Sequence, residues 1–379
     1  MRVAFNKPTF LGNEPDYVSS AARAGNVSGG GDFTARCQQL LQRQLGSARV
    51  FLTTSCTSAL ELAALLISLA PGDEVIVPSF SFVSSANAFA LRGARPVFAD
   101  SRPDTLNMDE AKLEPLITRR TKAIVAMHYA GIACEMDSIN EIAERHGVPV
   151  IEDNAHGLFA TYKGRQLGSL GCMGTQSFHG TKNFTCGEGG ALLINDASYI
   201  PKAELAWEKG TDRLRFMRGQ VEKYTWVSLG SSFLLSDLLA AYLFAQLERR
   251  EEITRQRQAT WNYYYDNLEQ WANESQIRLP IIPNHCSNPY HLFYLVLPDA
   301  EQRTRLMQHL AAHEIESAFH YVPLHTSPMG KRFGGRQGTC PVVEEMSERL
   351  LRLPFYTGLT EHELARVVAV LHEFEPVTS

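Results

Sequence analysis

The sequence predicts an α/β protein with a large, mostly parallel sheet covered by helices on both faces, followed by a smaller α/β domain. Between residues 71 and 153, short apolar stretches alternate with helical segments, the pattern of parallel strands joined by right-handed crossovers. A different pattern follows over the last hundred or so residues, without a low-complexity linker. The 379 residues, 44% of them apolar, suffice for two cores. We therefore expect a large domain over 1–235, a connecting helix over 236–271 and a small domain over 272–379.

The first half of the chain supplies most of the predicted sheet. A glycine-rich entry loop over 25–32 precedes a helix that places Phe33, Cys37 and Leu41 on one face. The next predicted elements are a strand beginning at Val50, a helix to about Leu69, strands at 74–78, 96–99, 123–127 and 148–152, and helices at 83–92, 108–117 and 136–146.

The second half begins with a glycine-rich turn over 187–190 and an apolar strand at 191–194. A helix at 198–209 then leads into a polar, arginine-bearing loop at 210–232. The remaining predicted elements are a long helix at 236–271, strands at 293–297 and 317–321, and helices at 300–313 and 361–374.

Composition and charge exclude several classes of function. The formal net charge of -5 leaves no overall basic field for nucleic acid or an anionic membrane. The seven cysteines are scattered and never in C-x-x-C spacing, which argues against a disulfide framework and a metal site. The amino terminus lacks the apolar segment of a signal peptide, and the longest apolar runs are broken by Glu61 or Asp237. We expect a cytoplasmic protein.

The stretch from Ser177 to Gly190 contains the residue most suited to chemistry. Lys182 lies among small and polar residues, and burial of its amine would lower the pKa and make it a nucleophile toward an aldehyde. A lysine taken alone is most often a surface residue. Ligands of parallel sheets bind beyond the carboxyl ends of the strands, so Lys182 is expected to meet Phe82, Asp153 and His156, which follow other strands.

These residues match the needs of a cofactor that uses a pyridine ring as an electron sink. Such a ring needs an anion at its nitrogen, a lysine for a Schiff base and anchors for a phosphate. Asp153 and Lys182 offer the first two, and Phe82 can cover one ring face. The expected phosphate anchors are Thr57, Ser58, Ser177 and the helix N-terminus beside them. Ordinary alternatives stay open: helix capping by Ser55 or Thr57, a turn-capping aspartate and a core aromatic.

Five motifs together carry a family resemblance. They are Thr54-Ser-Cys-Thr-Ser-Ala-Leu60, Pro71-Gly-Asp-Glu-Val-Ile-Val-Pro-Ser-Phe-Ser-Phe82, Glu152-Asp-Asn-Ala-His156, Ser177-Phe-His-Gly-Thr-Lys-Asn183 and Gly187-Glu-Gly-Gly190. Over nearly its whole length the chain resembles the DegT/DnrJ/EryC1/StrS sugar-nucleotide aminotransferases, pyridoxal-phosphate enzymes of the aspartate-aminotransferase fold (fold type I). The resemblance implies a homodimer with shared active sites, with a tetramer left open.

The resemblance also implies roles for individual residues. Lys182 would form the Schiff base, Asp153 would contact the ring nitrogen, and Phe82 would cover the ring. The phosphate and the turn around it would be held by Cys56, Thr57, Ser58 and Ser177. His156 replaces a common glutamine and would donate a hydrogen bond to the cofactor's phenolic oxygen, although its protonation state is open. Ser232 replaces an asparagine that contacts the phosphate across the dimer.

A finer resemblance points to the subgroup that makes dTDP-4-amino-4,6-dideoxygalactose. It rests on Ser232 and on Cys134-Glu-Met136, Lys223-Tyr-Thr-Trp226 and His320-Tyr-Val-Pro-Leu-His325. The implied reaction moves the amino group of L-glutamate to C4 of dTDP-4-keto-6-deoxy-D-glucose, for cell-surface polysaccharides such as enterobacterial common antigen or O-antigen. The expected substrate residues are His320, His325, Lys223 and Arg218.

Several alternatives remain at this stage. The basic residues of loop 210–224 are pyrophosphate ligands or simply face solvent. Amination at C3 and formation of the gluco epimer are open. A sugar dehydratase of the same fold would carry histidine in place of Lys182. A non-catalytic protein that senses pyridoxal phosphate would need a fused binding domain, which the sequence does not show.

Overall fold

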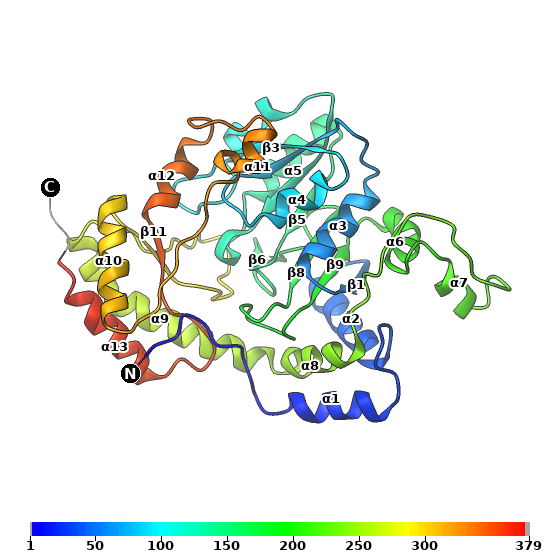
Figure 1. Ribbon diagram of the computed structural model, residues 1–379, viewed down its shortest axis with the longest axis horizontal. Coiled ribbons are helices and arrows are strands. Elements are labelled where there is room, and N and C mark those ends of the chain that lie inside the picture. The colour runs from blue at the N-terminus through cyan, green and yellow to red at the C-terminus, as the bar shows by residue number, and fades with distance from the viewer. Residues whose placement is uncertain (1, 376–379) are drawn as a thin grey trace.

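The computed structural model describes residues 2–375, and a seven-stranded sheet forms its centre (Figure 1). The strand order is β1 (Arg49–Thr53), β9 (Gly190–Ile194), β8 (Met173–Ser177), β5 (Val150–Asp153), β4 (Thr121–Met127), β2 (Glu74–Pro78) and β3 (Arg95–Ala99). Within this sheet only β9 runs antiparallel to its neighbours. The predicted large, mostly parallel sheet is confirmed.

Helices cover both faces of the sheet, because successive side chains of a strand point to opposite sides. One layer contains α3 (Cys56–Leu66), α4 (Ser84–Ala90) and α6 (Ile200–Trp207), and the other contains α2 (Asp32–Leu45), α5 (Met136–His146) and α8 (Asp237–Glu248). Phe51 and Val75 pack in the first layer, whereas their chain neighbours Val50 and Ile76 pack in the second. The strands are therefore buried on both sides.

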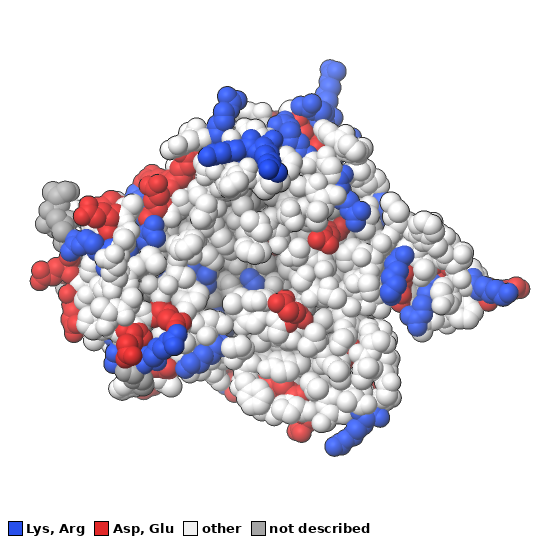
Figure 2. Space-filling model, viewed as in Figure 1, with Lys and Arg blue, Asp and Glu red and all other residues white. Residues whose placement is uncertain are grey.

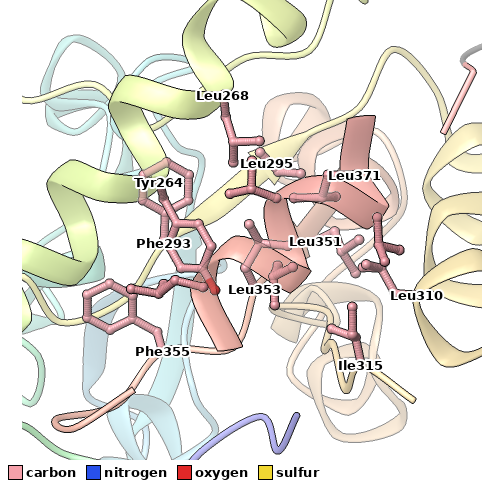
Figure 3. Close-up of a cluster of buried hydrophobic side chains, with 14 of the residues drawn as sticks. Tyr264, Leu268, Phe293, Leu295, Leu310, Ile315, Leu351, Leu353, Phe355 and Leu371 are labelled. Atoms are coloured by element: carbon pink, nitrogen blue, oxygen red, sulfur yellow. The ribbon is translucent and has the colours of Figure 1, made fainter. Parts of the chain in front are cut away.

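A separate hydrophobic core lies in the C-terminal third (Figure 3). Its elements are α9 (Arg250–Glu274), β10 (Tyr294–Val296), α10 (Ala300–Ala312), β11 (Leu350–Arg352) and α13 (Glu361–His372). Phe293, Leu351 and Leu371 belong to this core, and Val3 joins it through a parallel bridge to Ile315. The amino-terminal segment thus packs against the C-terminal elements. The exact division of the chain into domains stays a prediction.

Residues 208–232 form an arm that projects from the body of the molecule (Figure 1). The arm carries α7 (Arg213–Met217) and exposes Phe216, Met217, Tyr224, Trp226 and Leu229. The remaining elements are α1 (Glu14–Arg23), α11 (Pro328–Arg332), α12 (Pro341–Arg349), a ribbon of β6 (Thr161–Tyr162) and β7 (Arg165–Gln166), and 3-10 turns at 110–112, 114–116, 129–131, 197–199 and 324–326. None of the helices within residues 2–375 has the length and apolar character needed to cross a membrane.

Three predicted elements differ from the structure. The helix predicted at 108–117 is a pair of 3-10 turns, because Pro115 has no N–H with which to continue a helical ladder. The helix predicted at 236–271 is two helices, since the backbone of Arg249 leaves helical geometry (φ -103°, ψ 24°). The strand predicted at 317–321 is reduced to an isolated bridge to β11.

Candidate active site

A cavity of about 480 Å³ lies beside the carboxyl ends of β5 and β8, and most of the predicted site residues line it. The face viewed in Figure 2 is hollowed near its middle, between the sheet and the C-terminal elements. The predicted residues that line the cavity are Cys56, Thr57, Phe82, Asp153, His156, Ser177, Lys182 and His320. The fold therefore gathers residues from both halves of the chain at one place.

Lys182 lies in the loop between β8 and β9, and backbone hydrogen bonds join the two sides of this loop. The N–H of Gly180 donates to the carbonyl of Gly187 at 2.8 Å, and Gly187 has a φ of +85°, which glycine adopts without strain. Burial lowers the pKa of the Lys182 amine to about 8, although the neighbouring Asp153 opposes the shift. A neutral amine, able to act as a nucleophile or base, is therefore well populated near that pH.

Asp153 ends β5, and its side chain is held by two donors. The hydroxyl of Ser85 donates to Oδ2 at 2.6 Å, and the N–H of Ala155 donates to Oδ1 at 3.2 Å. The hydroxyl of Ser81 lies 2.6 Å from that of Ser85 and extends the network. These donors orient the carboxylate at the cavity wall. The sequence interpretation missed Ser85, for which the one available signal is its place one helical turn after Phe82.

The polar turn before α3 divides its side chains between capping and the cavity. Ser55 is the N-cap, and its Oγ accepts the N–H of Ser58 at 3.0 Å. The Ser58 hydroxyl is bonded within the same turn and lies outside the cavity lining. Thr57 lines the cavity with its hydroxyl 2.7 Å from that of Ser84. Cys56 lines it as a neutral thiol, because burial raises its pKa. The capping interpretation thus holds for Ser55, while phosphate binding by Thr57 stays a prediction.

Three histidines from distant segments gather on one wall of the cavity. His156 stacks on His291 with ring centroids 4.3 Å apart, and it lies parallel to His320 at 6.3 Å. Burial and the charge of Lys182 lower the pKa of His156, so its imidazole is neutral. Its buried Nδ1 has no hydrogen-bond partner among the described residues. Because buried polar atoms are normally bonded, this nitrogen is placed to meet a ligand.

The other predicted residues lie outside the cavity lining. His325, expected to line the sugar pocket, is instead fully buried, with Nδ1 2.6 Å from the Ser79 hydroxyl and Nε2 2.8 Å from Glu344. These bonds satisfy both ring nitrogens, so the contacts of His325 are structural. The arm carries the rest, namely Arg218, Lys223 and Ser232. The Arg218 guanidinium is paired there with a carboxylate of α6.

The sequence pattern of a known family spans almost the whole chain. Residues 11–372 match the profile of the DegT/DnrJ/EryC1/StrS aminotransferase family. The chain belongs to this family. The GDP-perosamine synthase of Caulobacter vibrioides is 34% identical over 374 residues, which cover 98% of each chain. The spore coat polysaccharide biosynthesis protein SpsC of Bacillus subtilis is 32% identical over 87% of this chain and 86% of its own.

A solved structure shows the same fold. The putative sugar aminotransferase Spr1654 from Streptococcus pneumoniae, in its PLP form, matches with a TM-score of 0.91 and 26% identity, over 98% of each chain. The predicted family, fold type I and pyridoxal-phosphate-dependent aminotransferase are confirmed.

The cavity residues fit pyridoxal phosphate. Lys182 supplies an amine of lowered pKa, Asp153 supplies an anchored carboxylate, and His156 supplies an unpartnered nitrogen. Gly190 keeps this region compact, because a Cβ there would lie 2.3 Å from the backbone carbon of Ser55. These features offer the nucleophile, anion and polar contacts that such a cofactor requires.

Proposed function

We propose that this aminotransferase moves the amino group of L-glutamate to C4 of dTDP-4-keto-6-deoxy-D-glucose, giving dTDP-4-amino-4,6-dideoxy-D-galactose for a cell-surface polysaccharide. The observation that carries amino transfer is the presence of Lys182 and Asp153 on one cavity. The two relatives described above support a sugar nucleotide as the acceptor and a polysaccharide as the destination. The choice of dTDP and C4 rests on the sequence motifs at 134–136, 223–226 and 320–325.

Lys182 is the proton carrier of this proposal. When bound, pyridoxal phosphate supplies an electron-withdrawing ring that acidifies the reacting carbon of the substrate. The neutral Lys182 amine takes the proton from the α-carbon of glutamate and later delivers one to C4 of the sugar. Asp153, oriented by Ser85, holds a proton on the ring nitrogen and so strengthens electron withdrawal. The face of the sugar that is turned toward Lys182 decides the epimer.

The remaining cavity residues hold and orient the cofactor. Thr57 and Ser177 bind the phosphate with the N-terminus of α3, where free N–H groups and the helix dipole favour an anion. Ser58 supports phosphate binding by holding the turn before α3 through its hydrogen bonds, and Cys56 lines the cavity in the same turn. Neutral His156 donates a hydrogen bond to the phenolic oxygen. Phe82, which is 59% exposed at the cavity, covers one face of the ring.

A second copy of the chain completes the site in this proposal. The arm exposes a group of aromatic and apolar side chains, and Trp226 is 74% exposed. An apolar patch of this kind marks an interaction surface. Ser232, Lys223 and Arg218 lie on the arm and would reach the partner's cavity, where they contact the cofactor phosphate and the sugar pyrophosphate. The change Trp226→Asp is expected to shift the protein to monomers in sedimentation, with loss of activity.

One experiment tests the reaction. The purified protein, loaded with pyridoxamine phosphate, is incubated with dTDP-4-keto-6-deoxy-D-glucose, and the product is examined by NMR. An axial amine at C4 supports the proposal. An amine at C3 or an equatorial amine at C4 would replace the proposed product with one of the alternatives. Failure with the dTDP sugar together with turnover of a GDP-linked 4-keto-sugar would assign a different nucleotide.

A further inference from the structure

His291 lies in the segment that leads from α9 to β10, and hydrogen bonds hold both its backbone and its ring. The buried Arg257 donates from Nη2 to the carbonyl of His291 at 2.6 Å and from Nε to the carbonyl of Tyr290 at 2.8 Å. On the ring side, Nδ1 of His291 lies 2.8 Å from Oδ1 of Asn183, the residue after Lys182. The ring therefore has a defined position at the cavity wall.

The backbone of this segment is strained next to His291. Tyr290 has a φ of +54°, a left-handed conformation that a residue with a side chain rarely adopts, and Oδ1 of Asn288 accepts its N–H at 2.8 Å. Pro289 packs closely against the opposite loop, because a Cβ on Gly131 would lie 2.2 Å from its Cγ. Strain of this kind persists only where the surrounding structure imposes it, and it concentrates at functional sites. The protein thus accepts a costly conformation in order to place the His291 ring.

Asn183 determines which nitrogen of His291 carries the proton. The carbonyl of Pro289 can only accept, so the Asn183 atom that lies 2.7 Å from it is the amide nitrogen. The amide oxygen of Asn183 therefore faces Nδ1 of His291 and accepts its proton. Burial, together with the charges of Lys182 and Arg257, lowers the pKa of His291, so the ring is neutral and Nε2 carries a lone pair.

The ring of His291 stacks on that of His156, with centroids 4.3 Å apart and an interplanar angle of 29°. Nδ1 of His156 has no hydrogen-bond partner within residues 2–375, so ring contacts orient His156. From this arrangement we infer that His291 is the positioning residue of His156: Asn183 and Arg257 fix the His291 ring, and the face of that ring fixes His156. The inference rests on the proposed contact between His156 and the phenolic oxygen of the cofactor.

A neutral stacked ring can hold His156 without changing its charge. A carboxylate in the same place would favour the imidazolium form and raise the pKa of His156. The groups that act on His156 instead disfavour a second proton: after burial, these are Lys182, His291, His320 and Arg352. His156 is therefore held in place and kept neutral by the same surroundings.

The pH dependence of the visible absorption band of the cofactor-loaded protein reports the contact of His156. A donor to the phenolic oxygen withdraws negative charge that would otherwise stabilise a proton on the nitrogen joining Lys182 to the cofactor. Loss of the donor should therefore raise the pH at which this nitrogen loses its proton. The variants are His156→Phe, His291→Leu, which fills the space without a flat ring, and His291→Phe, which keeps a flat ring. The control is His362→Ala, a change at an exposed histidine of α13.

We expect His156→Phe to raise the pH midpoint by about one unit or more, the magnitude of a hydrogen bond to a charged group. His291→Leu should produce most of this rise, because the His156 ring loses the face on which it stacks. His291→Phe and the control should stay close to the wild type. An unchanged midpoint in His291→Leu, or an equal rise in the leucine and phenylalanine variants, would overturn the inference.

Nitrogen-15 NMR of labelled histidines in the cofactor-free protein provides a second test, which for the wild type needs no variant to fold. We expect His291 to be neutral with its proton on Nδ1, and a proton on Nε2 would overturn the inference. The His156 signal should move in His291→Leu but not in His291→Phe. If His156→Phe leaves the absorption midpoint unchanged, the proposed phenolic contact fails, and this NMR comparison still decides whether His291 positions His156.

Discussion

Two neighbouring carboxylates on β5 differ in their surroundings: one is enclosed by the protein and the other faces the cavity. Glu152 is fully buried and accepts the N–H groups of Gly168, Leu170 and Gly171 at 2.7, 2.5 and 2.7 Å, while His128 contacts its Oε2 at 2.9 Å. Asp153, the next residue, accepts from Ser85 and Ala155 and lines the cavity. Glu152 is hydrogen-bonded entirely within the protein, whereas Asp153 can still accept a hydrogen bond from a ligand in the cavity. Adjacent positions on a strand face opposite sides, so one residue is structural and the next functional.

The largest effect is expected on the functional side, at Lys182. The change Lys182→Ala should lower amino transfer by about 10²–10⁴-fold or more, because it removes both the covalent link and the proton carrier. The measurement is the rate of cofactor conversion with glutamate. Borohydride treatment of the wild type should fix the cofactor on Lys182, as seen by mass spectrometry of the digested protein. Lys163→Ala, a change at an exposed lysine, serves as control, and near-normal activity of Lys182→Ala would refute the assignment.

The change Glu152→Gln should act on stability, with a loss of about 3–5 kcal/mol in the free energy of unfolding, because it removes the charge from a fully buried network. An amide also cannot accept all of the N–H groups that surround the carboxylate. Denaturant unfolding monitored by circular dichroism measures this loss. Unchanged stability would show that the network does not depend on the charge.

The matched change Asp153→Asn should act on catalysis instead. An amide oxygen still accepts from Ser85, so the fold should persist, whereas kcat should fall by about 10²-fold or more because the ring nitrogen loses its anion. Steady-state kinetics and unfolding of the same preparation test both halves of the statement. The assignment of Glu152 to stability and Asp153 to catalysis is refuted if Asp153→Asn unfolds while Glu152→Gln remains stable and inactive.

A smaller effect is expected at Ser85, which touches Asp153 from α4. The change Ser85→Ala removes a hydrogen bond to a charged group, worth about 1.5–3 kcal/mol, and kcat should fall by roughly tenfold. KM for the sugar should not move, because Ser85 lies behind the carboxylate. Ser347→Ala, which removes a hydroxyl of α12, is the control. A change in KM with constant kcat would indicate a direct contact with the substrate.

The smallest expected effect is a pH dependence of cofactor uptake. The Lys182 amine attacks an aldehyde only when it is deprotonated, and its pKa is lowered to about 8. The rate at which the cofactor-free protein takes up pyridoxal phosphate should therefore rise with pH up to about 8 and level off above it. Stopped-flow absorbance follows the reaction. A rate that continues to rise toward pH 10 would show an amine in ordinary solvent.

The sequence predicted the residues that follow local patterns and missed those that depend on packing between distant segments. Lys182 and Asp153 stand in motifs after strands, so topology alone placed them on one rim. Arg352 and His291 lie in ordinary-looking C-terminal segments, and only the docking of those segments brings them to the cavity. His325 carried the same sequence signal as His320 but points into the protein.

Local chain breaks were similarly hard to foresee. The apolar spacing over 236–271 is continuous, and no proline or glycine marks the interruption at Arg249, whose side chain bonds to Leu11 and Glu252. The position of the Ser58 hydroxyl was hard to foresee for a related reason. Thr57 and Ser58 are adjacent on a helix and point in different directions, so only one of the two hydroxyl groups reaches the cavity.

The hairpin that holds Lys182 should tolerate fewer changes in length than the arm over residues 208–232. Ser177 pairs with Gly190 at its base, and Gly180 pairs with Gly187 nearer its tip. An inserted residue inside this closed loop would displace the amine, whereas insertions in the projecting arm leave it in place. If the arm contacts the acceptor as proposed, new acceptor sugars would be gained by remodelling the arm, while the length of the hairpin is kept constant.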